Sequence, residues 1–201
     1  MNLIDLLFPP KCVFCRTRSR QSICGACQGT LPWVTSSYAD GVASPLYYSG
    51  KARDAVLRYK FNGFSLYAKT FGLLMAQAAQ NAGLKPDLIT WVPSSRLRRW
   101  KRGYDQCERL SAELSRVMGI PRRKLLKKTT HTKSQTKMRQ DKQRTDNVRG
   151  AYTVCSPCDA KTVLLIDDVY TTGSTIYECR EALLRAGVPR VLCLTLARSR
   201  R

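Results

Sequence analysis

Residues 163–175 constrain the fold more than any other part of the chain. Four apolar residues, 163–166, run into the adjacent acids Asp167 and Asp168, and a short turn rich in hydroxyls and glycine follows. An uninterrupted apolar run of this length is typical of a strand buried on both faces of a parallel sheet. Apolar residues from Ile176 onward recur at helical spacing. The stretch therefore predicts a strand, a turn and a helix in succession.

The same unit predicts a binding site. Gly187 and Pro189 end the helix, and residues 191–196 form the next strand, so the ligand crevice lies beyond the strand's carboxyl end. Backbone N–H groups of residues 172–175 can cradle a phosphate at the helix N-terminus, while acids one step earlier accept hydrogen bonds from a sugar diol. GxxxxGK[ST] and GxGxxG are absent. A ribose-phosphate site is predicted; the alternative is an ordinary strand end.

Two Cys-x-x-Cys pairs near the N-terminus indicate a metal site. They consist of Cys12, Cys15, Cys24 and Cys27. Two such pairs complete a closed tetrahedral site, the geometry of structural Zn²⁺. Four unrelated thiols or an iron–sulfur cluster are the alternatives. The third pair, Cys155 and Cys158, is predicted to be a plain loop, and Cys107, Cys179 and Cys193 are predicted core residues.

The net charge is the other unusual feature. Lys and Arg number 35 against 14 Asp and Glu, a formal charge of +21. Such an excess favours a polyanionic partner; a merely soluble basic surface is the alternative. One basic segment, residues 96–102, follows a predicted strand and would lie at the ligand edge as a loop. Residues 127–147 contain almost no apolar side chain and are predicted to form a mobile loop or hairpin, in which His131 is solvated.

The basic loop 127–147 could close over a phosphorylated ligand or grip a nucleic-acid backbone. Because the charge exceeds what one small phosphorylated ligand needs, we also consider single-stranded DNA as a partner. The basic candidates are Arg98, Arg99, Lys101, Lys127, Lys128, Lys133, Lys137 and Arg139. Aromatic stacking platforms could come from Trp33, Trp91, Trp100, Tyr67 and Tyr104, although Trp91 and Tyr67 fit core positions as well.

Targeting signals are weak. No apolar run reaches the roughly 18 residues that span a bilayer. The first ten residues lack a basic segment and contain Asp5 and two prolines, which argues against a signal peptide. A cytoplasmic location is therefore expected, where cysteines are metal ligands or buried thiols.

Residues 163–175 resemble the motif of type I phosphoribosyltransferases that binds 5-phosphoribosyl 1-diphosphate (PRPP), and the whole chain resembles the ComF family of competence-associated proteins. Asp105 stands where the family usually has an amide. Further matching segments are Tyr48-x-Gly50-x-x-Arg53, Leu57-x-x-Lys60-x-x-Gly63, Val92-Pro93-Ser94, Arg102-Gly103-Tyr104-Asp105-Gln106, Gln135-Thr136-x-Met138, Arg144 and Asn147-x-x-Gly150-Ala151-Tyr152.

The resemblance implies an α/β fold of the type I phosphoribosyltransferase kind, a mainly parallel twisted sheet flanked by helices, after a small zinc element. The expected division is 1–40 for the zinc element and 41–201 for the phosphoribosyltransferase-like domain. Asp167 and Asp168 would be catalytic, and Mg²⁺ would accompany PRPP. The implied PRPP-binding residues are Val169, Thr171, Thr172, Gly173, Ser174, Thr175, Pro93, Ser94 and Arg102.

Two functions stay open at this point. One is a PRPP-binding, phosphoribosyltransferase-like protein of DNA uptake or use of extracellular DNA, with a DNA-uptake helicase as partner. The other is a non-catalytic, zinc-containing module for single-stranded DNA in which PRPP is regulatory or a relic. Expected strands lie near 44–48, 88–92, 163–167 and 191–196, and expected helices near 52–60, 66–82, 104–118 and 174–186.

Overall fold

The centre of the computed structural model is a five-stranded sheet whose strand pairs are all parallel. The structure describes residues 10–35, 38, 40–61, 67–129 and 150–200, without the side chains of Arg96, Arg98 and Lys101. The strands run in the order β1 (Val42–Ala43), β7 (Arg190–Arg198), β6 (Thr162–Tyr170) and β3 (Leu88–Trp91), and β2 (Leu46–Tyr47) also pairs with β7. The predicted mainly parallel α/β fold is confirmed.

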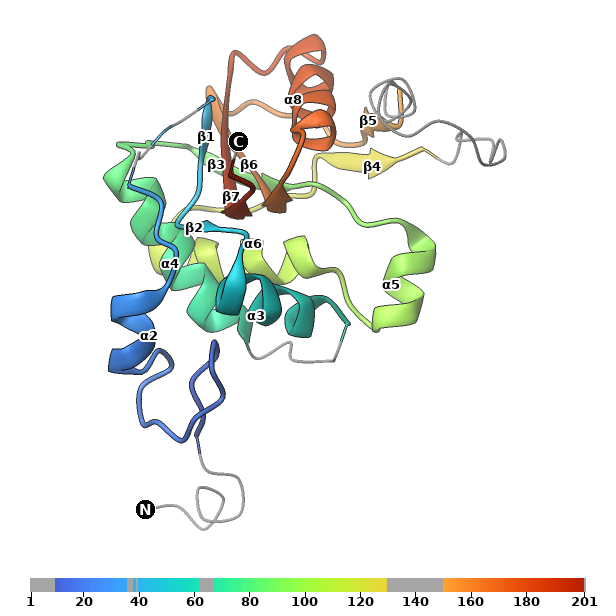
Figure 1. Ribbon diagram of the computed structural model, residues 1–201. Coiled ribbons are helices and arrows are strands. Elements are labelled where there is room, and N and C mark those ends of the chain that lie inside the picture. The colour runs from blue at the N-terminus through green and yellow to red at the C-terminus, as the bar shows by residue number, and fades with distance from the viewer. Residues whose placement is uncertain (1–9, 36–37, 39, 62–66, 130–149, 201) are drawn as a thin grey trace.

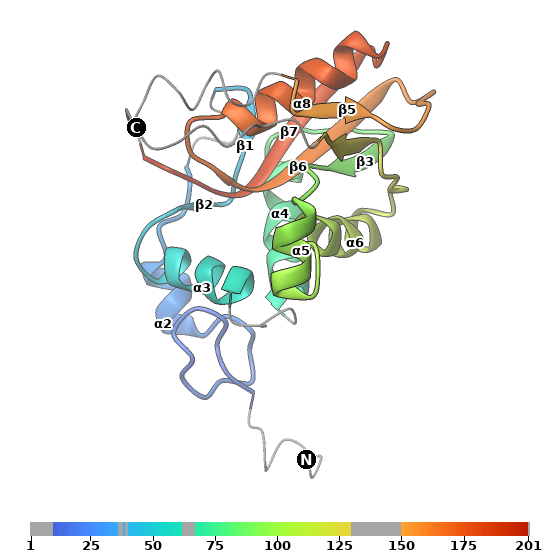
Figure 2. The same cartoon turned by 90° about the vertical axis from the view of Figure 1, so that its right-hand side faces the viewer.

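Helices cover both faces of this sheet (Figures 1 and 2). On one face lie α3 (Gly50–Phe61), α4 (Tyr67–Asn81) and α6 (Gln106–Met118), and on the other lies α8 (Ser174–Arg185). Strand β6 contributes buried apolar side chains to both faces of the sheet. Leu164 and Ile166 join the core under α4 and α6, whereas Val163 and Leu165 join the core under α8. Because side chains alternate along a strand, the apolar run is buried on both sides.

Helix α5 (Arg96–Arg102) corrects the prediction of a loop in this segment. Its residues are mostly good helix formers, but its apolar side chains Leu97 and Trp100 are 62% and 81% exposed. A helix that buries no apolar face leaves no periodic signal in the sequence. In Figure 1 α5 stands apart from the sheet. The other small elements are α2 (Gly25–Thr30) and an antiparallel pair, β4 (Leu126–Lys128) and β5 (Tyr152–Val154).

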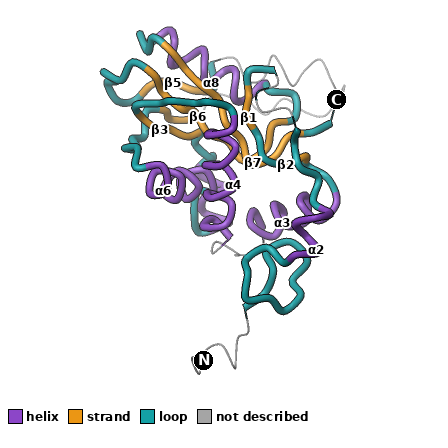
Figure 3. The backbone as a smooth tube through the Cα atoms, turned by 90° about the vertical axis from the view of Figure 1, so that its left-hand side faces the viewer, coloured by secondary structure: helices purple, strands orange, loops and turns teal. Residues whose placement is uncertain are grey.

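The N-terminal element lies beside α3, on the side of the sheet that carries α4 and α6 (Figure 3). Val13, Phe14 and Leu31 belong to the same buried cluster as residues of α3 and α4. The few apolar side chains of the N-terminal element therefore pack as part of the main core. The division at residue 40 stays a prediction. No helix in the described part of the chain is long and apolar enough to cross a membrane.

Candidate functional site

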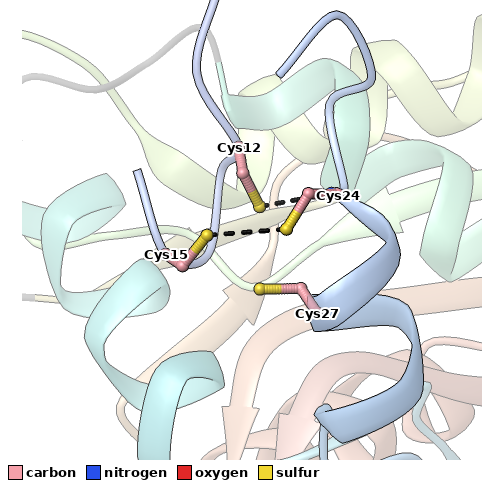
Figure 4. Close-up of side chains that lie close together, drawn as sticks. All are labelled: Cys12, Cys15, Cys24 and Cys27. Carbon is pink, nitrogen blue, oxygen red and sulfur yellow. Dashed lines mark hydrogen bonds between the residues drawn. The ribbon is translucent and has the colours of Figure 1, made fainter. Parts of the chain in front are cut away.

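The four N-terminal cysteines converge on one point, and Figure 4 shows their sulfur atoms directed toward one another. All four Sγ atoms lie within 4.8 Å of one another. Cys15 Sγ is 3.6 Å from Cys24 Sγ, and the Cys24 backbone N–H donates to Cys12 Sγ at 3.4 Å. The second pair straddles the start of α2, with Cys24 as its N-cap and Cys27 inside it.

This geometry fits Zn²⁺. Tetrahedral Zn–S bonds of about 2.3 Å place sulfur atoms about 3.8 Å apart, close to the observed spacing. A backbone N–H donated to a sulfur stabilises thiolate character, which a metal ligand needs. Four thiolates leave no open position for substrate, so the metal is structural. The predicted ligand set is thus brought together by the fold.

Helix α3 connects this zinc element to the rest of the molecule. Arg58 Nη2 donates to the carbonyls of Val13 and Phe14, at 3.1 and 2.7 Å. Phe14 also packs near Phe71 of α4, with ring centroids 6.1 Å apart. The first cysteine turn is therefore fixed to α3 by hydrogen bonds and to α4 by packing.

A polar cavity of about 240 Å³, which we call the acid cavity, lies at the carboxyl ends of β3 and β6. Asp167 and Asp168 enter it from β6. Asp167 Oδ1 accepts the Asp168 backbone N–H at 2.8 Å and the Cys107 thiol at 3.4 Å. Lys60, from the end of α3, reaches Asp168 Oδ1 with its Nζ at 2.7 Å. The cavity is lined by Lys60, Val92, Pro93, Ser94, Ser95, Arg102, Cys107, Lys128, Tyr152, Asp167, Asp168, Val169 and Thr175.

The turn between β6 and α8 adjoins the acid cavity and forms a hollow of about 30 Å³. Gly173 caps α8 with φ 80°. A Cβ there would lie 2.5 Å from the Tyr177 ring and 2.7 Å from the Tyr170 ring, so glycine is needed for both space and conformation. The Thr172 and Ser174 hydroxyls are 2.9 Å apart. The hollow is lined by Asp167, Val169, Tyr170, Thr171, Thr172, Gly173, Ser174, Thr175 and Ile176.

Asp105 holds the loop that follows β3. Its Oδ2 accepts the Ser94 backbone N–H at 2.9 Å, and its Oδ1 accepts the N–H groups of Cys107 and Glu108 at 3.1 and 3.3 Å. It is therefore the N-cap of α6 and at the same time the anchor of the Ser94 loop. An acid at this position has a structural role that requires no contact with a ligand.

The electrostatics of the acid cavity are set by burial. Burial raises the pKa of Asp167 to about 7, and the charge of Asp168 adds to this effect. Burial also raises the pKa of the Cys107 thiol, and both acids raise it further. For Lys60, burial opposes the charge, but attraction and hydrogen bonding to Asp168 outweigh it and raise the pKa. Lys60 is therefore a nearly buried ammonium ion, and Asp167 titrates near neutral pH.

The predicted ribose-phosphate residues meet in space. Asp167, Asp168, Val169, Thr175, Pro93, Ser94 and Arg102 line the acid cavity, and Thr171, Thr172, Gly173 and Ser174 line the hollow. The sequence pointed to Lys60 and Tyr152 only as parts of segments that match the family, and to Cys107 only as a core residue; all three line the acid cavity. The match Leu57-x-x-Lys60-x-x-Gly63 marked Lys60 without assigning it a role in the site.

The candidate DNA-binding residues are only partly placed. A larger cavity of about 690 Å³, which we call the basic cavity, is lined by Arg99, Lys127 and Lys128, together with Lys124. Arg98 and Lys101 belong to α5. Lys133, Lys137 and Arg139, with His131 and most of the loop 127–147, lie outside the described residues. Trp91 is buried and cannot stack on a base, whereas Trp100 is open to solvent.

The fold and sites define an α/β protein with a parallel sheet and an N-terminal zinc ribbon, and a family model described as a double zinc ribbon domain matches residues 3–56. Competence protein F of Haemophilus influenzae is 33% identical over 72% of this chain and 66% of the relative. DNA utilization protein YhgH of Escherichia coli O157:H7 is 30% identical over 96% of this chain and 86% of the relative. The chain belongs to this family, the ComF family, as the sequence motifs indicated.

Solved structures with related architecture are phosphoribosyltransferases and related enzymes. The glutamine PRPP amidotransferase from B. subtilis has a TM-score of 0.46 at 19% identity over 65% of this chain and 26% of that one. Adenine phosphoribosyltransferase from Thermoanaerobacter pseudethanolicus has a TM-score of 0.39 at 15% identity over 69% of this chain and 83% of that one. Because these TM-scores are low, the fold is described by the strand order of the chain itself.

Proposed function

We propose that the protein binds PRPP in the acid cavity and the adjoining hollow. The observation that carries this proposal is the convergence of two acids, a hydroxyl-rich turn and the Ser94 loop at one edge of a parallel sheet. The acids suit the ribose diol, because carboxylates accept hydrogen bonds from hydroxyls. The turn suits the 5-phosphate, because it opens helix α8 with backbone N–H groups and hydroxyls.

A phosphoribosyl transfer would then depend on positioning and charge. The bond from ribose C1 to the diphosphate would break, and a bond from C1 to an acceptor nitrogen would form. Arg102 lines the acid cavity, where its guanidinium would offset charge on the departing diphosphate. Asp167 and Asp168 would hold the ribose while C1 carries positive charge.

Isothermal titration with PRPP tests the binding site. We expect saturable heat with the native protein and its loss in Asp167→Asn and Asp168→Asn, which preserve side-chain shape. Asp159→Asn is the matched control, since Asp159 is exposed and pairs with Arg123 away from the cavity. Heat that is absent in the native protein, or unchanged in both variants, refutes the site. Pyrophosphate release across a panel of bases distinguishes an enzyme from a binding protein.

A second candidate function is binding of single-stranded DNA, and the surface next to the acid cavity favours it. Trp100 is 81% exposed on a basic helix, which suits stacking of a base. The basic cavity offers Arg99, Lys127 and Lys128 for backbone phosphates. Relatives named for competence and DNA utilization agree with this role. A cytoplasmic role in DNA uptake or use, with a DNA-uptake helicase as partner, belongs to the same proposal.

Titration of a fluorescent oligonucleotide at several salt concentrations tests this function. We expect the affinity to fall steeply with salt, and Trp100→Ala and Lys127→Gln to weaken binding. Lys161→Gln is the control, because Lys161 is exposed and precedes the amino end of β6, opposite the cavity. Affinity that does not depend on salt, or equal losses in the control, would contradict the proposal.

A further inference from the structure

Lys60 is an unusual residue for the position it holds. Its side chain is only 16% exposed, and its Nζ lies 2.7 Å from Asp168 Oδ1 inside the acid cavity. A lysine seldom becomes this buried without a paired role, because removing an ammonium ion from water is costly. The pair with Asp168 compensates both charges. Lys60 thus places a fixed positive charge directly against the acids proposed to hold ribose.

The same acids do not fit a Mg²⁺ ion held by the protein. With Cys107 they form a cluster whose donor atoms lie within 4.8 Å of one another, the sole such cluster outside the zinc element in the described chain. Mg²⁺ prefers six oxygen ligands in a near-ideal octahedron. Here one donor is a buried thiol, and a carboxylate oxygen of Asp168 is occupied by the Lys60 ammonium. One carboxylate oxygen of the acid pair therefore already has a cationic partner from the protein itself.

We propose that Lys60 supplies the positive charge that a divalent cation would otherwise bring to Asp167 and Asp168, and that it positions a phosphoribosyl diphosphate ligand. This proposal rests on the proposed function. An ammonium group has three donors, and Asp168 engages one of them. Because Lys60 lines the cavity, its other donors can reach a ligand oxygen there. Binding should then depend strongly on Lys60 and weakly on Mg²⁺.

The last turn of α3 is anchored in a way that suits such a role. The Tyr59 hydroxyl donates to the Gln106 carbonyl at 2.8 Å, and the Tyr104 hydroxyl donates to the Tyr59 carbonyl. Arg58 fixes the same turn to the zinc element. Three successive residues, 58–60, therefore contact three separate parts of the fold. A charge held by such a turn is preorganised, which is the property that makes electrostatic groups effective in a site.

The test is titration of PRPP in the presence of EDTA and again with excess Mg²⁺. We expect the native affinity to differ by no more than about threefold between the two conditions, and Lys60→Gln to lose about tenfold or more in EDTA. Mg²⁺ should recover part of that loss, because it replaces the missing charge. Lys60→Arg should retain most of the affinity. Lys51→Gln, an exposed lysine on the same helix, should bind as the native protein does.

The outcomes separate the two proposals. Native affinity in Lys60→Gln, with the native response to Mg²⁺, overturns the role of Lys60 and leaves the PRPP site intact. No binding by the native protein in either condition overturns the proposed function together with this inference. If Lys60→Gln fails to fold, the native protein decides between the outcomes. PRPP affinity that differs by no more than about threefold between EDTA and excess Mg²⁺ supports the role of Lys60, and affinity that is lost in EDTA and restored by Mg²⁺ overturns it.

Discussion

The zinc element and the acid cavity are built in opposite ways. All four zinc ligands come from residues 12–27, so local spacing alone places them around one ion. The acid cavity takes its lining from α3, α5, α6 and the ends of β3 and β6, which are far apart in the chain. The positions of the zinc ligands depend mainly on a short segment, whereas the positions of the acid-cavity residues depend on how the helices pack on the sheet. The two regions are nevertheless linked, because α3 contacts the zinc element through Arg58 and the acids through Lys60.

Loss of zinc should have the largest effect, and it tests how separate the two regions are. We expect Cys27→Ser to lose bound zinc and about 5 kcal/mol or more of stability, since metal binding supplies folding free energy. Phe14 and Cys27 share the core of α3 and α4, so thermal unfolding should stay one transition at lower temperature. Cys155→Ser, at an exposed loop position, is the control. A native melting temperature in the zinc-free variant would show that the element is independent.

Gly173→Ala should have the next largest effect on stability. The substitution changes the turn between β6 and α8, next to the acid cavity. A Cβ would approach two tyrosine rings in a left-handed backbone conformation, so we expect a loss of about 2–4 kcal/mol. Gly187→Ala separates strain from crowding, because Gly187 has φ 90° with no atom near its Cβ position. Urea unfolding measures both. Equal losses in the two variants would mean that the tyrosine contacts contribute nothing.

Asp167→Asn should make stability less dependent on pH. The folded-state pKa of Asp167 is raised to about 7, so its stability contribution is complete below about pH 4 and is lost as pH rises through about 7. The variant avoids that loss and should exceed the native stability by about 2–4 kcal/mol above about pH 8, with little difference near pH 4. Asn can still accept the Asp168 N–H. Asp159→Asn should keep the native profile, and a variant destabilised at every pH would contradict the prediction.

Arg58→Gln should have the smallest effect and tests the link between the regions. It removes two hydrogen bonds from a charged donor to the first cysteine turn, so we expect a loss of about 1–2 kcal/mol. Because Lys60 follows in the same turn, PRPP affinity should fall by a few-fold while zinc stays bound. Arg53→Gln, which removes an exposed pair with Asp54, is the control. Unchanged affinity with reduced stability would show that α3 does not couple the two sites.

Much of the fold could be predicted because its signals are local and periodic. The apolar run before Asp167 became β6, and the helical spacing after it became α8. Helix α5 was missed because Leu97 and Trp100 face solvent and no buried stripe marks the segment. The spacing of apolar residues indicates which face of a helix is buried, so it cannot predict a helix that has no buried face.

The roles of Asp105 and Lys60 could not be predicted for a different reason. Asp105 holds the Ser94 loop across eleven positions of the chain, and Lys60 meets Asp168 across more than a hundred. No local pattern encodes such a partner. Asp105 in the sequence is simply an acid near basic residues, whereas in the fold it satisfies backbone N–H groups that would otherwise lack an acceptor.

The sequence by itself determined the zinc ligands, the acids and the turn, because each follows from residue types at short, fixed spacing. The family followed from the same motifs. Only the tertiary structure decided that Lys60 pairs with Asp168 and that Arg58 connects α3 to the zinc element. Those contacts depend on how α3 packs between the N-terminal element and the sheet edge. Burial then raises the pKa of Asp167, because desolvation is a property of the folded environment and not of the residue.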